Sequence, residues 1–311
     1  MQYPHQPVLV GQVVEDLAIL ADGIYVDGTV GTGGHSLAIA QHLGPRGHLL
    51  CLDRDTDAVM IAKARLSNLS APVTAVKSNY VELDEILHGM GITHVQGVLL
   101  DLGLSSLQLE HSGRGFSFNR DEPLDMRMDE NDEITARDLV NERTGEELET
   151  ILRKYGEEPR ARAIARSIVR EREQRPIESS LRLARIIESV VRPSRRPVAR
   201  HPATKAFQAL RIAVNQELEN LRICLSRIPS LLAPGGRLVV LSYHSLEDRP
   251  VKQALADWER GCICPPDLPV CACNRTPLFR RIRKKGKKPS PDEIAANPRA
   301  RSAILRAAER I

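Results

Sequence analysis

The chain has 311 residues, of which 42% are hydrophobic and 27% charged, and this balance permits a packed core and excludes global disorder. Its length allows two domains, or one domain with a large insertion. The net charge of +4 indicates no particular partner, and no apolar run is long enough for a membrane span. Residues 1–5 lack the features of a secretory signal, so we expect a cytoplasmic protein with reduced thiols and no membrane partner.

Strands and helices alternate over the first hundred residues. Strands are predicted at residues 24–30, 48–53, 72–77 and 95–101, and helices at residues 35–43, about 55–66 and near Leu83. The strand at 95–101 is apolar on both faces, as in the centre of a parallel sheet. This alternation predicts a doubly wound α/β domain.

The alternation stops after the fourth predicted strand. From about residue 108 to residue 200 no segment favours a strand. Residues 126–185 are charged and favour helices, and prolines separate the helical segments of this region. We therefore predict an inserted helical domain at residues 108–203.

The sheet is expected to resume after this insertion. Apolar residues from Phe207 to Leu232 recur at alternating three- and four-residue steps and predict one amphipathic helix, which Pro-Gly-Gly at 234–236 ends. A fifth strand is predicted at residues 237–242, and two short ones near residues 279–283 and 302–306. The α/β core thus covers residues 1–107 and, with a basic C-terminal region, residues 204–311.

A glycine-rich loop follows the first predicted strand, where residues 27–35 read Asp-Gly-Thr-Val-Gly-Thr-Gly-Gly-His. Glycines let the backbone approach a ligand closely, at the carboxyl edge of the sheet. Asp53 ends the second strand, where an acid can accept hydrogen bonds from ribose hydroxyls. The pattern fits a dinucleotide or S-adenosylmethionine, and glycines that only make a tight turn are the structural alternative.

Two details of this loop favour S-adenosylmethionine. The Gly-x-Gly-x-x-Gly spacing fails, because Ser36 stands where a third glycine is expected. Asp27, immediately before the loop, would repel a pyrophosphate but can hold the ammonium group of a methionine moiety. Both details disfavour an NAD-dependent oxidoreductase on the same fold.

Asp101 ends the fourth predicted strand, at the position that faces the transferred methyl group in this architecture. Its carboxylate can accept a hydrogen bond from an exocyclic amine and orient the amine for in-line attack on the sulfonium methyl. An aspartate that merely caps the next helix is the alternative.

Cysteines and basic residues are unevenly distributed. Cys262, Cys264, Cys271 and Cys273 form two Cys-x-Cys pairs that can bind zinc tetrahedrally, with four reduced thiols as the alternative. Cys51 and Cys224 lie in apolar surroundings and are predicted core residues.

Basic stretches at residues 192–205 and 275–288 favour a nucleic-acid partner, although a single stretch is more often a solvated face.

Motifs in a fixed order along the chain carry a family resemblance. They occupy residues 5–9, 33–36, 53–55, 101–103, 114–118, 124–129, 201–204, 207–211, 244–249 and 297–303. On these motifs the chain resembles the RsmH/MraW family, bacterial methyltransferases that modify the N4 amine of a cytosine in the decoding centre of 16S ribosomal RNA. Thr32, Tyr80 and Tyr243 are mild departures from residues that are frequent in the family.

The resemblance implies a class I S-adenosylmethionine-dependent methyltransferase fold, a Rossmann-like sheet with an inserted all-helical domain. It implies S-adenosylmethionine as cofactor, with contacts from Gly33, Gly34, His35, Asp53, Tyr80, Asp101 and Gln108. Asp27 joins this set through the loop argument, Asp101 is a candidate catalytic residue, and His244 is a second candidate near the substrate side. The family does not require a metal.

The implied partner is 16S rRNA within a 30S subunit or a late assembly intermediate. Phe116 and Phe118, with arginines around them, can stack on bases of this RNA or anchor their loop in the core. A non-catalytic RNA-binding or assembly factor and a DNA or protein methyltransferase are competing interpretations of the same sequence. The sequence leaves open whether the substrate is free RNA or an assembled subunit, whether the chain forms a homodimer, and which group accepts the proton.

Overall fold

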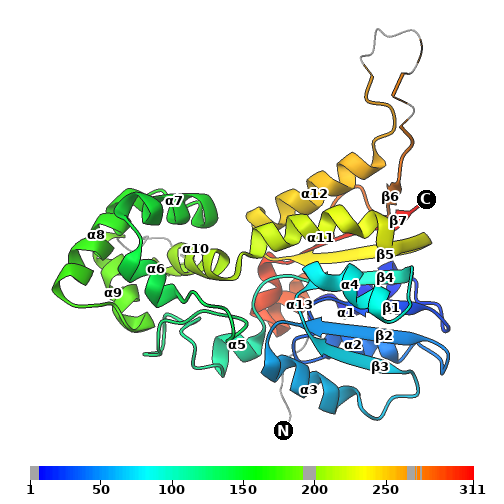
Figure 1. Cartoon of the computed structure of the whole chain (residues 1–311), viewed down its shortest axis with the longest axis horizontal. Helices are drawn as coiled ribbons and strands as arrows, with labels where there is room; N and C mark the ends of the chain where they lie inside the picture. Colours follow the sequence, from blue (N-terminus) through cyan, green and yellow to red (C-terminus); the bar gives the residue numbers. More distant parts are fainter. Residues whose placement is uncertain (1–6, 192–200, 265–269, 271, 274) are drawn as a thin grey trace. The chain divides into compact units, whose positions relative to one another are not determined.

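A computed structural model of the chain describes residues 7–191, 201–264, 270, 272–273 and 275–311. The chain divides into two compact units (Figure 1). Met1–Gly103 and Glu219–Ile311 make up the first, which we call the sheet unit, and Leu104–Leu218 make up the second, the helical unit. Among the residues described, no helix has both the length and the apolar character needed to cross a bilayer.

The sheet unit is built on a seven-stranded sheet in the order β3-β2-β1-β4-β5-β7-β6. The strands are β1 (Ile24–Asp27), β2 (His48–Asp53), β3 (Val73–Lys77), β4 (Val95–Asp101), β5 (Leu232–Ser242), β6 (Phe279–Arg281) and β7 (Ile304–Arg310). Strands β1 to β5 pair in parallel, whereas β7 is antiparallel to both β5 and β6. The strand order reverses between β1 and β4, and in open α/β sheets ligands bind at the carboxyl ends of such strands.

Helices cover both faces of this sheet. They are α1 (Val10–Leu17), α2 (Gly34–Ala40), α3 (Thr56–Leu66), α4 (Leu83–Gly89), α11 (Glu217–Leu231), α12 (Ser245–Glu259) and α13 (Pro291–Ala296), with 3-10 turns η1 (Tyr80–Glu82) and η2 (Pro298–Ser302). Side chains alternate along β2, so Leu49 and Cys51 pack with α1 to α3, and Leu50 and Leu52 pack with α4, α11 and α12. Near-continuous apolar strands are stable between two such layers. Cys51 and Cys224 are core residues, as predicted.

The helical unit has its own hydrophobic core. Its helices are α5 (Ser106–Glu110), α6 (Ala136–Glu142), α7 (Gly145–Gly156), α8 (Ala161–Gln174), α9 (Ser180–Val190) and α10 (Thr204–Asn215). Ser105, Thr135 and Thr144 begin α5, α6 and α7 with capping boxes, which explains locally why these helices start where they do. The unit runs from Leu104 to Leu218 and so includes α10, whereas the sequence suggested an insertion at residues 108–203.

The single long helix predicted from Phe207 to Leu232 is wrong. The chain forms two helices, α10 and α11, and Gln216 between them has the left-handed φ of 52°. A left-handed residue breaks the helical hydrogen-bond ladder. The buried side chain of Asn215 donates to the carbonyl oxygen of Met126 at 2.8 Å and accepts from the backbone N–H of Met128 at 2.7 Å. Tertiary contacts therefore accompany the break.

Strand β5 also begins earlier than predicted. Its pairing with β4 starts at Leu232 opposite Val95, skips a stretch and resumes at Arg237 opposite Gly97. The Pro-Gly-Gly segment at 234–236 bulges out of the ladder, and Gly235 has a φ of 78°. The segment that was expected to end a helix is therefore a bulge within a strand.

Candidate cofactor and active site

The glycine-rich loop connects β1 to α2 and brings backbone rather than side chains to the carboxyl end of the sheet. Gly33 caps α2 with a φ of 78°, a conformation that favours glycine. A Cβ atom on Gly28 would lie 2.7 Å from Cδ2 of Leu100 and 3.3 Å from Cβ of Tyr80. Tyr80, which opens the 3-10 turn η1, therefore lies directly beside the loop.

The buried side chain of Asp27 holds the glycine-rich loop through hydrogen bonds. The side chain is buried, its Oδ2 accepts a hydrogen bond from Oγ of Ser36 at 2.6 Å, and its Oδ1 accepts from the backbone N–H of Thr29 at 3.1 Å. Burial raises the pKa of the Asp27 carboxyl above its usual range, although these hydrogen bonds oppose the shift. Ser36, where a dinucleotide fingerprint has glycine, thus supplies the hydroxyl that Asp27 needs.

Asp53 holds the middle of the loop from the end of β2. Its Oδ2 accepts from the backbone N–H of Gly31 at 2.8 Å, and its Oδ1 accepts from the backbone N–H of Asp55 at 3.0 Å. Burial raises the pKa of Asp53 to about 6, and the charges of Asp55 and Asp27 add to the increase. A carboxylate with this pKa changes its charge just below neutral pH.

Asp101, at the end of β4, lies between His35 and Tyr243. The Tyr243 hydroxyl donates to Oδ1 of Asp101 at 2.8 Å, and Nε2 of His35 lies 3.4 Å from Oδ2. The backbone N–H of Asp101 donates to Oγ1 of Thr29 at 2.6 Å, which ties β4 to the glycine loop. The Asp101 side chain is 22% exposed and that of His35 only 6%. Asp101 therefore keeps an accessible face, the Tyr243 hydroxyl fixes its orientation, and His35 lies within ion-pair distance of it without making a hydrogen bond in the described part of the chain.

The negative charge of Asp101 favours the protonated forms of its two neighbours, His35 and Tyr243. Burial alone would lower the pKa of His35, but the neighbouring carboxylates of Asp101 and Asp27 outweigh it, and the pKa is raised. Burial and the Asp101 charge hold the pKa of Tyr243 well above its usual value, so its hydroxyl stays protonated. Nδ1 of His35 is buried and has no hydrogen-bond partner among the residues described, as expected of a group that contacts a ligand.

Comparison with known proteins identifies the chain. The model of the MraW methylase family matches residues 2–311. The chain belongs to this family. It is 47% identical over its full length to a ribosomal RNA small subunit methyltransferase H of Dehalococcoides mccartyi, covering 88% of that protein. A relative of the same name in Heliobacterium modesticaldum is also 47% identical, with full coverage of both chains.

Among solved structures, an rRNA methylase of Streptococcus thermophilus is 12% identical to this methylase. The match covers 100% of this chain and 99% of that one, with a TM-score of 0.41. The fold class follows from the sheet itself, whose parallel strands and antiparallel β7 form the Rossmann-like architecture predicted from the sequence. The protein is thus a methyltransferase with S-adenosylmethionine as its methyl donor, as the sequence predicted.

His244 begins α12 in this methylase. Its Nδ1 accepts from the backbone N–H of Glu247 at 3.3 Å, and its Nε2 lies 3.0 Å from Oε1 of Glu247. The other Glu247 oxygen accepts from the backbone N–H of Tyr243 at 2.8 Å. His244 therefore has a capping role that helps to place Tyr243, and its catalytic role stays a prediction.

Gln108 belongs to the helical unit, where it completes the capping box of α5 by accepting from the backbone N–H of Ser105 at 3.1 Å. Its predicted contact with the cofactor stays a prediction.

Phe116 is buried in the core of the helical unit, which favours the anchoring role over base stacking. Phe118 stacks on His201, with ring centroids 4.2 Å apart.

Sequence reasoning missed Thr29, Ser36 and Tyr243 as members of this site. Each acts through its hydroxyl group. Thr29 and Tyr243 bond to Asp101, and Ser36 bonds to Asp27. The failed glycine spacing at Ser36 was a usable signal, because a small polar residue there needs a partner. Tyr243 gave only the signal that it precedes His244 in place of phenylalanine, and its pairing with Asp101 arises from two strands far apart in the sequence.

Proposed function

We propose that the protein transfers the methyl group of S-adenosylmethionine to the N4 amine of a cytidine in the decoding centre of 16S rRNA, in the P-site region. The observation that carries this proposal is the partly exposed Asp101 carboxylate at the carboxyl end of β4, which accepts a hydrogen bond from Tyr243 and lies 3.4 Å from Nε2 of His35. Both relatives described above are named as methyltransferases of small-subunit ribosomal RNA, which supports the substrate.

The residues around the loop fit this cofactor. Gly33 has a φ of 78° and presents backbone without a side chain, whereas the lack of a side chain at Gly34 makes room for Pro7, which a Cβ would approach to 2.9 Å. The buried Nδ1 of His35, which has no partner in the described part of the chain, offers a polar contact, and Asp53 offers acceptors for ribose hydroxyls. Tyr80 beside Gly28 supplies a ring for the adenine, and Asp27 supplies a negative charge for the methionine ammonium.

The chemistry rests on positioning. S-adenosylmethionine supplies an electrophilic methyl group when bound. The N4 nitrogen of cytosine is a weak nucleophile because its lone pair is delocalised into the ring. Asp101 accepts a hydrogen bond from one N4–H, which raises electron density on the nitrogen and aligns it for attack. Because the Tyr243 hydroxyl already occupies one lone pair of Oδ1, the orientation of the carboxylate is set before substrate arrives.

Exposed basic side chains on the surface support an RNA partner. Helix α8 carries Arg162, Arg166 and Arg170 at four-residue steps, all exposed. The helical unit thus offers one basic helix face for phosphate contacts. Because the target amine lies in folded RNA, we propose that the substrate is a 30S subunit or a late assembly intermediate, with the nucleotide splayed out.

The C-terminal basic stretch is partly engaged within the sheet unit. Arg280 pairs with Glu309, Arg281 with Glu259, and Arg283 with Asp16. The lysines of the same stretch are exposed, and they are Lys284, Lys285, Lys287 and Lys288. Only part of this block is therefore available to phosphate. Residues 192–200 of the other basic stretch lie outside the described part of the chain.

Deleting the gene should remove one N4-methylated cytidine from 16S rRNA. Mass spectrometry of small-subunit rRNA nucleosides from cells with and without the gene measures this directly. Labelled methyl transfer by the purified protein onto free 16S rRNA, 30S subunits and assembly intermediates then identifies the substrate. An unchanged nucleoside profile, with no transfer to any of these substrates, would favour a non-catalytic assembly factor and reject the proposal.

The affinity for S-adenosylhomocysteine should fall as the pH drops through about 6. Burial places the pKa of Asp53 near 6, and the ribose hydroxyls need its ionised form as acceptor. Since bound hydroxyls lower that pKa, affinity is complete above pH 7 and weakens by up to about tenfold per pH unit below 6. Calorimetric titration with S-adenosylhomocysteine between pH 5 and 8 provides the measurement.

Asp53→Asn is the matched control for this pH dependence. It keeps the size of the side chain at position 53 and leaves His35 in place, but it removes the carboxyl group that titrates. The variant should bind more weakly at pH 7.5 and show a flatter profile between pH 5 and 7. A wild-type affinity that is constant over this range would show that the charge of Asp53 plays no part in binding.

A further inference from the structure

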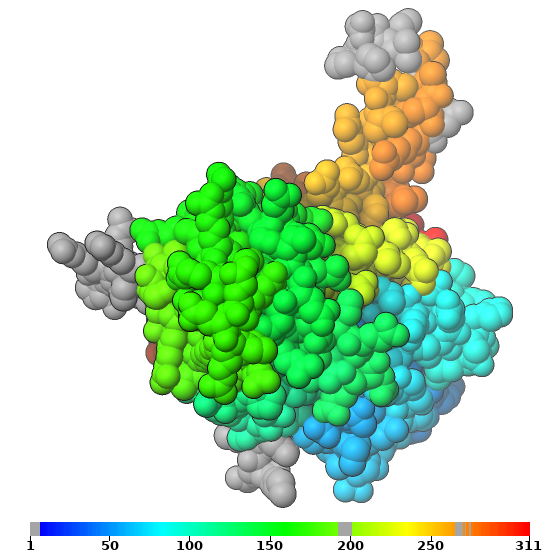
Figure 2. Space-filling model, turned by 60° about the vertical axis from the view of Figure 1, so that its left-hand side comes forward, coloured from blue at the N-terminus to red at the C-terminus, as the bar shows by residue number. Residues whose placement is uncertain are grey.

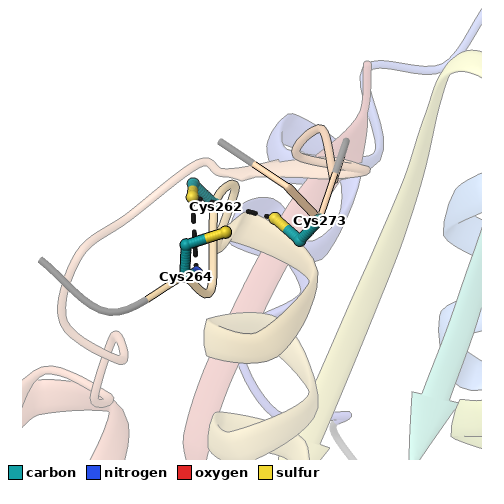
Figure 3. Close-up of side chains that lie close together, drawn as sticks. All are labelled: Cys262, Cys264 and Cys273. Carbon is teal, nitrogen blue, oxygen red and sulfur yellow. Dashed lines mark hydrogen bonds between the residues drawn. The ribbon is translucent and has the colours of Figure 1, made fainter. Parts of the chain in front are cut away.

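A segment with three clustered cysteines connects α12 to β6. Its described residues project from the sheet unit, as the orange region of Figures 1 and 2 shows. Cys262, Cys264 and Cys273 point their sulfur atoms toward one another (Figure 3), and all three Sγ atoms lie within 4.8 Å of one another. Cys271, the fourth cysteine of the sequence pattern, lies outside the described residues.

The spacing of the sulfurs matches a shared metal ion. The Sγ atoms of Cys262 and Cys273 are 3.7 Å apart. Two thiolates bound to one tetrahedral zinc ion, each at about 2.3 Å, lie about 3.8 Å from each other. A disulfide would require about 2.05 Å. The observed separation excludes a disulfide and equals that of two ligands of one ion, a distance that two hydrogen-bonded thiols also adopt.

Backbone N–H groups point at each of the three sulfurs. The N–H of Ile263 donates to Cys273 at 3.5 Å, that of Cys264 to Cys262 at 3.4 Å, and that of Ala272 to Cys264 at 3.3 Å. Such N–H···S bonds disperse the negative charge of metal-bound thiolates and orient the ligands. The N–H groups of Ile263, Cys264 and Ala272 thus already provide donors for the three sulfurs.

The described residues of the segment form no apolar core that would explain this order. Ile263 is 48% exposed and Val270 is 75% exposed, so neither of these two aliphatic side chains is part of a core. A small structure without a core is commonly held by a metal ion or by disulfides.

We propose that Cys262, Cys264 and Cys273 bind a zinc ion that fixes the conformation of this projecting segment. Thiolates select soft or borderline metals, and a tetrahedral, redox-inert ion suits a structural site. The zinc joins residues 262–264 to Cys273 and so closes the projecting loop. The role is structural, because in the proposed methyl transfer the acting group is the Asp101 carboxylate, beside which His35 and Tyr243 lie.

Zinc measured by mass spectrometry after dialysis tests the site on the full-length protein. Wild type should retain about one zinc per chain, and Cys262→Ser and Cys264→Ser should each lose at least about tenfold in retained zinc. Ile263→Ser is the matched control, because it changes an exposed side chain between two ligands and removes no sulfur. It should keep its zinc.

Cobalt gives a second readout that does not depend on a variant folding. Replacing zinc with Co²⁺ in wild type should produce the visible absorption of tetrahedral cobalt and a sulfur-to-cobalt charge-transfer band. Chelation of the metal should speed proteolytic cleavage within residues 260–278 by roughly tenfold or more, because the open segment becomes populated. Metal-free protein with all thiols titratable and no cobalt bands, or a disulfide between Cys262 and Cys273, would overturn the proposal.

Discussion

Asp101→Asn should lower kcat for methyl transfer by roughly a hundredfold to a thousandfold, the range expected for a positioned acid–base or orienting group. Asparagine keeps the size of the side chain, but it loses the negative charge and turns an amide N–H₂ toward either Tyr243 or the substrate amine. The bond that Tyr243 donates to Oδ1 would then fix an amide that is a poorer acceptor. Single-turnover transfer to the rRNA substrate measures this effect on the chemical step.

Cofactor binding separates this role from a structural one. The backbone N–H of Asp101 still bonds to Thr29 in the variant, so the loop keeps its support. We expect the affinity of Asp101→Asn for S-adenosylhomocysteine to fall by at most about tenfold, since one oxygen acceptor remains. A variant that transfers methyl groups at the wild-type rate would remove Asp101 from the mechanism.

Tyr243→Phe is the companion variant, and it should lower kcat by about tenfold. It deletes one neutral hydroxyl that donates to Asp101, a bond worth about 0.5–1.5 kcal/mol. Because the ring itself remains, packing beside the carboxylate is kept. An effect as large as that of Asp101→Asn would indicate that the tyrosine hydroxyl contacts the reacting groups directly.

The positions of Asp27, Asp53 and Asp101 could be predicted because each ends a parallel strand. The carboxyl ends of neighbouring parallel strands meet at one edge of a sheet, so a residue that ends its strand is placed once the strand is recognised. The apolar runs in β2 and β4 were readable because helices bury both faces of the sheet. The strands that hold the site therefore follow from local patterns.

What the sequence did not reveal depends on contacts between distant segments. The turn at Gln216 looks helical by periodicity, but Asn215 bonds to Met126 and Met128, about ninety residues away in the chain. The pairing of Tyr243 with Asp101 likewise requires β4 and β5 to be neighbours. Periodicity describes which face of a helix is apolar, and it contains no information about such partners.

Asp27→Asn should weaken binding of S-adenosylhomocysteine by about tenfold to a hundredfold, corresponding to the 1.5–3 kcal/mol that hydrogen bonds to charged groups typically contribute. The carboxylate is buried, and each of its oxygens already accepts one bond, from Thr29 and from Ser36. A carboxylate oxygen has two lone pairs, so acceptor capacity for a ligand ammonium remains. Isothermal titration calorimetry at pH 7.5 gives the affinity.

A matched ligand distinguishes a contact with the ammonium from a general disruption of the loop. Methylthioadenosine has the adenosine and sulfur of the cofactor but no amino acid, so it has no ammonium group for Asp27 to hold. If Asp27 binds that group, Asp27→Asn weakens S-adenosylhomocysteine and leaves methylthioadenosine within about twofold of wild type. If the carboxylate only secures Ser36 and Thr29, both ligands weaken together, and Ser36→Ala reproduces the loss. Equal losses for the two ligands would therefore refute the ammonium contact, and with it the argument from Asp27 that the loop favours this cofactor over a pyrophosphate.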